Sequence, residues 1–235
     1  MESIDKIHGT YEKKLIEAQK AQVSSTVIKR LPRYHRYLGD LLRAGTLRIS
    51  SGKLAKIMGV TASQIRQDFN CFGGFGQQGY GYNIKYLHGK IAELLGVDEG
   101  FNAVIVGAGN LGRALAATHM FERRGITRLA LFDVNEAIVG TLVNGLRIYP
   151  LHMLKDFCLE NKVDIGVLTV PKEAADEVAG ILAEGGVKGI WNFANMELVP
   201  PSDDIIVENI HLGDSLMTLC YEIKSRESHR EGVDE

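Results

Sequence analysis

The sequence predicts an α/β protein of two domains, a helical N-terminal domain followed by a domain built on a parallel sheet. Three observations predict it. A β-branched run ends in Gly-x-Gly-x-x-Gly at residues 107–112 and leads straight into a helix. Helical and strand patterns alternate from there to the end of the chain, as in doubly wound sheets. Basic residues concentrate ahead of the glycine pattern, and 235 residues suffice for two modest domains.

The charge is distributed unevenly. The chain has a formal net charge of −2, but residues 24–98 carry 11 Lys and Arg against 4 Asp and Glu. Residues 99–235 carry 12 against 21. A basic domain beside an acidic one favours a polyanionic partner, and nucleic acid is the first candidate.

Composition excludes several classes of protein. A hydrophobic content of 45% and a charged content of 24% are typical of globular proteins. No apolar run reaches the roughly 18 residues of a membrane span, and the N-terminus lacks a signal-peptide core, so a cytoplasmic location without membrane contact is expected. Cys71, Cys158 and Cys220 form no CxxC pair, which argues against a disulfide framework or a metal site.

The first domain is expected over residues 23–98, after a polar extension over residues 1–22. Ser24 or Ser25 can cap a first helix, with Pro32 marking a second start or a kink and Gly45 the end. Ser50-Ser51 caps a second helix with Leu54, Ala55 and Ile57 for the core, which Gly59 ends. Thr61 caps a third helix that runs from Ala62 to Phe69 or Phe72. The segment from Tyr34 to Phe72 therefore predicts a helix-turn-helix.

The second helix of such a motif lies in the major groove of DNA. Gln64 can pair with adenine and Arg66 with guanine, while Ile65 and Phe69, four residues apart, face inward. The alternative is an ordinary three-helix domain with both polar side chains in solvent. The candidate DNA-binding residues are Ser50, Ser51, Thr61, Ser63, Gln64, Arg66, Gln67, Gln77, Gln78 and Tyr80.

The last three of these belong to an unusual stretch, residues 73–82, with five glycines and three aromatic residues. This composition favours a short hairpin of the winged-helix type, whose tip can touch phosphates or the minor groove. A hairpin without DNA contact is the alternative. Residues 84–95 then form an amphipathic helix that joins the two domains.

The glycine pattern predicts a dinucleotide site. Gly107 allows the tight turn, Gly109 lets backbone N–H groups approach a pyrophosphate, and Gly112 lets the helix pack close to the strand. Asp133 ends the second strand, 21 residues after Gly112, where an acid accepts hydrogen bonds from the ribose hydroxyls. Its charge would repel a 2′-phosphate and Val134 offers no compensating cation, so NAD(H) is expected rather than NADP(H).

The rest of the second domain, residues 99–211, continues the Rossmann pattern of a doubly wound parallel sheet. Helices are expected over 151–162 and 172–184, strands over 163–171, 188–193 and 205–207, and a final helix over 212–226 before a tail over 227–235. Ligands bind at the carboxyl ends of such strands. The candidate cofactor-binding residues are Gly107, Ala108, Gly109, Asn110, Leu111, Gly112, Asp133, Val134, Thr169, Val170, Pro171, Asn192 and Phe193.

Taken together, the two domains resemble the Rex family of redox-sensing transcriptional repressors. The resemblance runs from about Val23 to Lys224, through residues 29–38, 63–68, 72–83, 106–115, 131–133, 168–171 and 191–194. It implies a homodimer whose helix 212–226 swaps into the partner and lies between the partner's two domains. It also implies binding to palindromic operator DNA in the apo or NAD⁺ state, release by NADH, and control of fermentation and respiration genes.

Four departures from the family pattern stand out. Gln67 replaces a usual Lys or Arg, and Gln77 with Gln78 replaces a basic wing tip, which should flatten the salt dependence of DNA binding by about one unit of slope per lost contact. Thr118 replaces a Tyr, and His211 replaces an Asp that opens the final helix. The resemblance implies that these two positions meet near the nicotinamide across the dimer and are coupled to an arginine at the position of Arg36. The candidate switch and interface residues are Arg36, Thr118, His211 and Leu212.

Two other functions compete with an NADH-responsive repressor: a small NAD-dependent oxidoreductase with an accessory helical domain, and a nucleotide-binding scaffold. Hydride transfer needs a general acid or base. His119 and His152 are candidates, but neither lies in a recognisable catalytic motif and no domain remains to hold a substrate. We therefore expect that the protein is not an enzyme. An apolar pocket near Pro171 and Phe193 should prefer the neutral reduced ring, which makes NADH the expected ligand.

Overall fold

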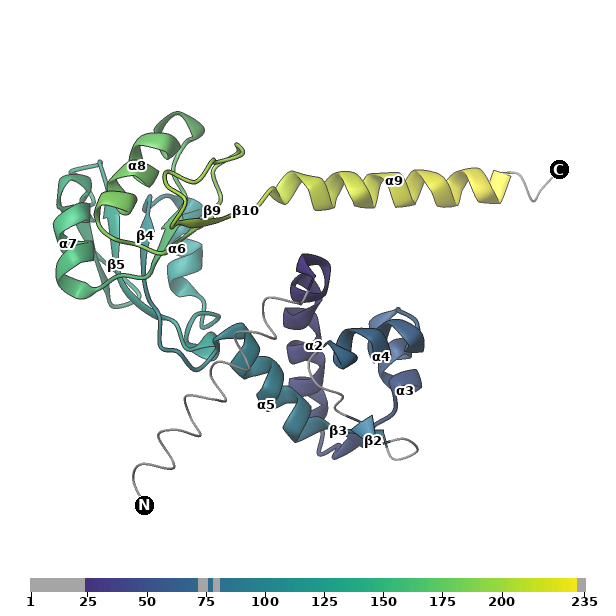
Figure 1. Cartoon of the computed structure of the whole chain (residues 1–235). Helices are drawn as coiled ribbons and strands as arrows, with labels where there is room; N and C mark the ends of the chain where they lie inside the picture. The colour runs from purple at the N-terminus through teal and green to yellow at the C-terminus, as the bar shows by residue number, and fades with distance from the viewer. Residues whose placement is uncertain (1–23, 72–75, 78–80, 232–235) are drawn as a thin grey trace, which may run out of the picture. The chain divides into compact units, whose positions relative to one another are not determined.

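The computed structural model describes residues 24–71, 76–77 and 81–231, and the side chains of all these except 76–77 and 227–231. The chain divides into two compact units, residues 1–98 and 99–235 (Figure 1). The predicted extension over 1–22, the predicted wing residues Gln78 and Tyr80, and residues 232–235 of the predicted tail lie outside the described residues.

The first unit contains the predicted helices, and the first three begin at their predicted caps. They are α2 (Ser25–Arg43), α3 (Ser51–Met58), α4 (Ala62–Asn70) and α5 (Ile84–Leu95). The hydroxyls of Ser24, Ser50 and Thr61 each accept a hydrogen bond from the backbone N–H three residues on, at 3.4, 3.2 and 3.1 Å. Pro32 lies inside α2, which continues through it, so the expected second helix start is absent.

The helix-turn-helix is formed by α3 and α4. Gly59 ends α3 in the left-handed conformation, with φ +65°. The expected core contribution of Ile57 is wrong, because its side chain is 43% exposed and Met58 is buried instead. Residues 54, 55 and 58 share one face of a helix with 3.6 residues per turn, and residue 57 does not. Ile65 and Phe69 are buried, as predicted.

The predicted hairpin is present as part of a three-stranded antiparallel sheet. The strands are β1 (Arg48–Ile49), β2 (Gly76–Gln77) and β3 (Gly81–Asn83), in the order β1-β3-β2. Gly81 has φ +71°, and a Cβ there would lie 2.8 Å from the carbonyl oxygen of Ile49. Tyr82 of β3 meets Phe69 of α4 edge to face, with ring centroids 5.0 Å apart, which ties the hairpin to the helix-turn-helix.

The second unit is a Rossmann sheet. Its parallel strands are β4 (Asn102–Val106), β5 (Thr127–Asp133), β7 (Leu146–Pro150), β8 (Ile165–Leu168), β9 (Gly189–Asn192) and β10 (Ile206–Asn209). The order β10-β9-β8-β4-β5-β7-β6 places the first strand, β4, beside the fourth, β8. The order reverses between these two strands, and doubly wound sheets bind ligands at that switch point.

One hairpin in this sheet escaped the sequence analysis. β6 (Leu142–Val143) pairs antiparallel with β7 through a turn at Asn144-Gly145, where φ is +49° and +81°. Asn-Gly directly flanked by the apolar residues Val143 and Leu146 is a typical hairpin signal, so the sequence did contain the information.

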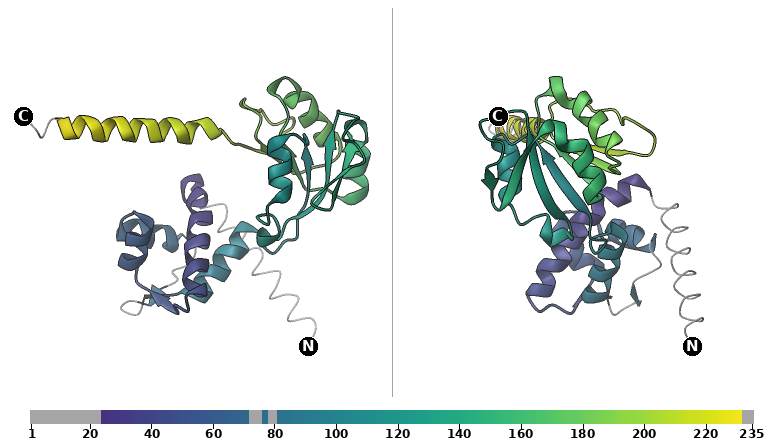
Figure 2. Two further views of the ribbon diagram at one scale, coloured as in Figure 1. Left: turned by 180° about the vertical axis from the view of Figure 1, so that it is seen from behind. Right: turned by 90° about the vertical axis from the view of Figure 1, so that its left-hand side faces the viewer.

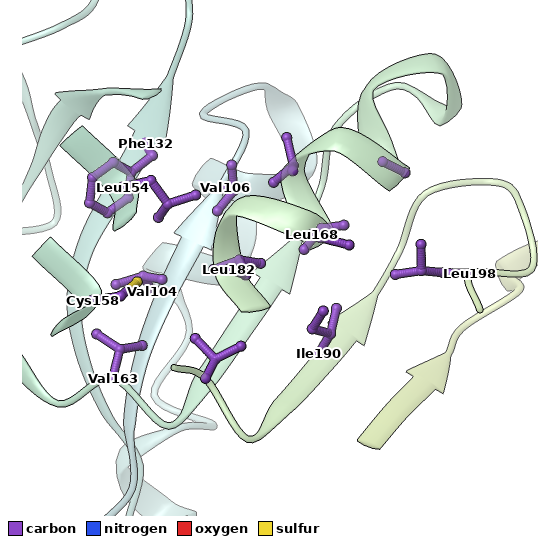
Figure 3. Close-up of a cluster of buried hydrophobic side chains, with 14 of the residues drawn as sticks. Val104, Val106, Phe132, Leu154, Cys158, Val163, Leu168, Leu182, Ile190 and Leu198 are labelled. Carbon is purple, nitrogen blue, oxygen red and sulfur yellow. The ribbon is translucent and has the colours of Figure 1, made fainter. Parts of the chain in front are cut away.

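Helices cover both faces of the sheet (Figures 1 and 2). Val104 and Val106 pack with α7 (Leu154–Asn161) and α8 (Lys172–Glu184) in one buried cluster, shown in Figure 3. Ile105 points to the other face and packs with Leu115 of α6 (Asn110–Ala117). Short 3-10 turns η1 (Glu122–Arg124) and η2 (Leu151–Met153) precede β5 and α7, so the helix expected over 151–162 is η2 plus α7.

The final helix, α9 (Leu212–Glu231), extends five residues beyond its predicted end. Its apolar side chains are uncovered in the single chain, with Leu216 62%, Leu219 54% and Ile223 49% exposed. Within the described part of the chain, no helix combines the length and apolarity needed to cross a bilayer.

Candidate nucleotide and nucleic-acid sites

The glycine pattern forms the loop between β4 and α6, at the switch point of the sheet. Gly107 has φ +98°, and a Cβ there would lie 2.6 Å from the carbonyl oxygen of Thr169. A Cβ on Gly112 would overlap the carbonyl oxygen of Gly107. These two glycines are therefore required by the packing of the protein itself, as the sequence analysis assigned them.

Gly109 differs from both. Its φ is −74°, and a Cβ there would meet no atom within 4 Å. It is the N-cap of α6, whose first turn receives no side-chain cap hydrogen bond. The loop thus leaves open space beside helix N–H groups and the positive end of a helix dipole, an arrangement that suits a pyrophosphate.

Asp133 braces this loop from the end of β5. Its Oδ2 accepts a hydrogen bond from the backbone N–H of Ala108 at 2.6 Å, and its Oδ1 accepts one from Asn135 at 2.8 Å. A carboxylate oxygen can accept a second bond, so both remain able to bind ribose hydroxyls. Val134, the next residue, is 75% exposed.

Thr169 braces the loop from β8. Its hydroxyl donates to the carbonyl oxygen of Gly107 at 2.7 Å, and its backbone N–H donates to Val106 at 2.8 Å. Val170 is half-buried, and Pro171 is an exposed N-cap of α8. These three residues lie at the carboxyl edge of the sheet, as predicted.

Asn192 requires a correction, because its side chain is fully buried and engaged with protein atoms. Its Nδ2 donates to the carbonyl oxygen of Met196 at 3.0 Å and to Oδ1 of Asn209 at 2.8 Å, and its Oδ1 accepts from the N–H of Ala194 at 2.9 Å. Both amide hydrogens are used, so this side chain fixes the loop after β9 rather than facing a nicotinamide. Phe193 is half-buried, with its ring 4.5 Å from that of Trp191.

A hollow of about 410 Å³ opens elsewhere on this unit. Apolar side chains that include Met120, Phe121, Trp191 and Ile206 line it, with Arg124 and Glu208. No predicted cofactor residue lies among its lining, and its apolar walls suit neither a pyrophosphate nor a ribose. We therefore place the candidate nucleotide site at the glycine loop.

The candidate nucleic-acid surface is on α4. Ser63, Arg66 and Gln67 are exposed there, and Nη1 of Arg66 donates to Oγ of Ser51 at 3.3 Å. Ser50 and Thr61 use their hydroxyls as helix caps while remaining exposed. The helix-turn-helix thus presents a polar face on the helix that is predicted to enter the major groove.

Gln64 is only half-buried, and its Nε2 donates to Oδ1 of Asp68 at 2.8 Å. Asp68 is fully buried and also accepts from Arg30 and Tyr34 of α2. Asp68 and Arg30 were not among the residues predicted to form this site. The only signals were the i, i+4 spacings Gln64–Asp68 and Arg30–Tyr34, because the partners lie 38 residues apart in the chain.

The four predicted switch residues lie in both units. In the first unit, Arg36 is exposed, with its guanidinium 5.4 Å from the centroid of the Tyr37 ring. In the second unit, Thr118 is the C-cap of α6 and its hydroxyl donates to the carbonyl oxygen of Leu115 at 3.1 Å, and Leu212 begins α9. Nε2 of His211 lies 2.9 Å from Oε2 of Glu197.

No group of three or more potential metal ligands occurs in the described ranges.

Family models match both units. Residues 98–196 match a model described as "CoA binding domain", and residues 22–70 match one described as "Putative DNA-binding protein N-terminus". Coenzyme A and NAD both contain an adenosine diphosphate part, so the first match agrees with the geometry of the glycine loop.

Similar proteins cover nearly the whole chain. "Redox-sensing transcriptional repressor Rex" of Caldicellulosiruptor saccharolyticus is 51% identical over 208 residues, which is 88% of this chain and 94% of that protein. The protein of the same name from Clostridium perfringens is 50% identical over 203 residues, 86% of this chain and 95% of its own length.

Solved structures of a Rex-family repressor are similar to this chain as well. RSP, described as a Rex-family repressor, was crystallised with β-NAD⁺ and operator DNA; that structure has a TM-score of 0.82 and 47% identity, covering 91% of this chain and 98% of its own. RSP with β-NADH has a TM-score of 0.82 and 44% identity, covering 89% and 98%. With relatives about half identical along nearly nine tenths of its length, this chain belongs to the Rex family of redox-sensing transcriptional repressors.

Proposed function

We propose that this protein is a repressor that binds palindromic operator DNA as a homodimer in its apo or NAD⁺ form and releases the DNA when NADH binds. The observation that carries this proposal is the match to RSP, whose structures include one with β-NAD⁺ and operator DNA and one with β-NADH. The chain belongs to a family of repressors, so the alternative of an NAD-dependent oxidoreductase is not favoured.

The nucleotide would occupy the glycine loop. Gly107, Gly109 and Gly112 shape the space for its pyrophosphate, and Asn110 and Leu111 supply backbone N–H groups, while Ala108, whose N–H is held by Asp133, lines the loop between them. Asp133 would receive the adenosine ribose beside Val134, and its charge favours NAD(H) over NADP(H). Thr169, Val170, Pro171 and Phe193 would surround the nicotinamide. Their mostly apolar character should favour the neutral ring of NADH over the charged ring of NAD⁺.

Operator binding would rest on α4. Gln64 and Arg66 are the proposed base readers, and Ser63 and Gln67 flank them on the same helix. The caps Ser50 and Thr61 and the neighbouring Ser51, together with wing residues Gln77, Gln78 and Tyr80, would contact the backbone or the minor groove. The glutamines at 67, 77 and 78 carry no charge, so the salt dependence of binding should be shallow.

The switch requires unequal NADH affinity for the two forms of the dimer. Moving the population from 1:99 to 99:1 takes about 5.5 kcal/mol, which two nucleotide sites can share. Arg36, Thr118 and His211 are the proposed coupling residues. His211 already pairs with Glu197 of its own chain, where the family resemblance implied an Asp, so we propose that switching in this member is altered.

The exposed apolar residues of α9 support the proposed dimer. Leu212, Leu216 and Leu219 would cost free energy if left in water, and exposed apolar surface of this kind marks an interaction site. A second copy of the chain would cover them. A bacterial repressor acts where the chromosome is, so we propose a cytoplasmic location.

The experiment is fluorescence anisotropy of a labelled palindromic duplex. The protein is first titrated onto the duplex, and the complex is then titrated with NADH, NAD⁺ and NADPH in separate series. We expect micromolar NADH to release the DNA, NAD⁺ to leave or strengthen binding, and NADPH to have little effect because of Asp133. Tight NADH binding without DNA release would contradict the proposal.

A further inference from the structure

Asp68 is the only carboxylate that is fully buried in the described part of the chain, and it lies on α4, the proposed recognition helix. Removing a charge from water is costly unless every acceptor position finds a donor. The question is therefore what this carboxylate does for the helix on which it lies.

Four donors surround it. Oδ1 accepts from Nη2 of Arg30 at 2.7 Å and from Nε2 of Gln64 at 2.8 Å, while Oδ2 accepts from Nε of Arg30 and the hydroxyl of Tyr34, both at 2.7 Å. A carboxylate has about four acceptor positions, so the set is complete. Burial by itself raises the pKa of Asp68, but the hydrogen bonds from Arg30, Tyr34 and Gln64 outweigh it, so the pKa lies below its usual value. Asp68 is charged at neutral pH.

The first consequence is mechanical. Arg30 holds Asp68 through two parallel bonds, a planar arrangement that restrains rotation of α4 about its own axis relative to α2. Tyr34, one turn further along α2, adds a third bond and packs its ring 4.9 Å from that of Phe69. These contacts with α2 therefore fix which face of α4 is turned outward.

The second consequence concerns Gln64. An ionised carboxylate can only accept, so the amide of Gln64 must turn its nitrogen toward Asp68. One N–H is held, and the other N–H and Oε1 make no hydrogen bond with the described part of the chain, so both can bind a partner. Adenine offers N6–H as a donor and N7 as an acceptor in the major groove, which matches this pair of groups. Gln67, exposed on the same helix, makes no side-chain hydrogen bond within the described residues.

We propose that Asp68 is a positioning residue for operator recognition, which holds the amide of Gln64 in the orientation that matches adenine. This inference rests on the proposed function and names a determinant of its specificity. Gln64 makes the base contact, and Asp68 acts through it.

The first test needs no variant and no DNA. NMR relaxation of the side-chain amides compares Gln64 with Gln67 in the free protein. The order parameter of Gln64 should approach the value of about 0.85 found in rigid backbone, and that of Gln67 should fall below about 0.6. Equal mobility of the two amides would overturn the inference, and this measurement also decides it if variants at Asp68 fail to fold.

The second test measures base preference. Affinity is determined for operators altered at one base pair at a time. Gln64→Ala should lose preference for adenine at one position, by between about 5-fold and about 150-fold. Asp68→Asn should relax preference at that same position, with the other positions and the salt dependence unchanged, and should add nothing further in the Gln64→Ala background. A core variant, Ile91→Val in α5, serves as a control for lost stability and should keep the preference.

The outcomes separate the two proposals. Full adenine preference in Asp68→Asn, or an equal loss at every position, overturns the role of Asp68 and leaves the repressor standing. A wild-type protein that binds no operator sequence overturns both.

Discussion

Gly107 and Gly109 lie two residues apart in the nucleotide loop, yet substitution by alanine should affect them in opposite ways. A Cβ on Gly109 meets nothing within 4 Å, and its φ of −74° suits any residue. Alanine is a poorer N-cap than glycine but restricts the unfolded chain, and these effects roughly cancel. Gly109→Ala should therefore change the free energy of unfolding by less than about 0.5 kcal/mol.

The same variant should bind the nucleotide more weakly. Its new methyl group would occupy the space beside the first turn of α6 that the pyrophosphate needs, so we expect the Kd for NADH to rise at least about tenfold, which is about 1.4 kcal/mol. Gly107→Ala should instead destabilise the fold by about 2 to 4 kcal/mol, because φ is +98° and the Cβ would lie 2.6 Å from the Thr169 carbonyl oxygen.

The assay uses Trp191, the single tryptophan, which lies in the nucleotide-binding unit. Its fluorescence during urea unfolding reports the stability of that unit, and NADH fluorescence gives the Kd in the same buffer. Gly140→Ala, at a residue with φ +83° where a Cβ would meet no atom within 4 Å, is a control for backbone strain alone. A Gly109→Ala variant that binds NADH as tightly as the wild type would refute the placement of the pyrophosphate.

Four further predictions follow from particular contacts. Asn192→Ala should lower the free energy of unfolding by about 2 to 4 kcal/mol in urea titrations, because it removes a buried amide together with its hydrogen bonds to Met196, Ala194 and Asn209; unchanged stability would contradict the role given to it. Gln67→Lys should tighten operator binding and steepen the plot of log K against log salt by about one unit, and an unchanged slope would place residue 67 away from the phosphates. The lowered pKa of Asp68 predicts that its contribution to stability is complete above the unfolded pKa of about 3.9 and is lost as pH falls through the lower folded pKa. Unfolding followed by circular dichroism below pH 4 should therefore show a smaller loss of stability in Arg30→Met, which lacks the two hydrogen bonds from the guanidinium to Asp68. Stopped-flow exchange of NADH should differ between the wild type and a Thr118→Tyr plus His211→Asp variant, and identical kinetics would remove the basis for altered switching.

Local features of this protein were predictable, and features that depend on tertiary contacts were not. The caps Ser50 and Thr61 and the glycine loop follow from neighbouring residues, so the sequence sufficed. β7 was missed although Asn144-Gly145 indicated its hairpin.

The candidate site shows the same division. Nothing local to Asp133 indicates that it also binds the N–H of Ala108, 25 residues away. Asp68 resembles a solvent-facing residue of an amphipathic helix until Arg30 and Tyr34 fold against it. Asn192 occurs at the end of a strand, where ligands bind, but its partners Met196 and Asn209 come from the loop and the strand that follow it.

Reciprocal coupling between DNA and NADH tests the central claim most directly. If NADH weakens operator binding by some factor, the operator must weaken NADH binding by the same factor. The measurement is the Kd of NADH for the dimer with and without a saturating operator duplex, with a scrambled duplex as control. The account predicts a rise in this Kd that equals the NADH-induced loss of operator affinity. An NADH affinity that the operator leaves unchanged would contradict it.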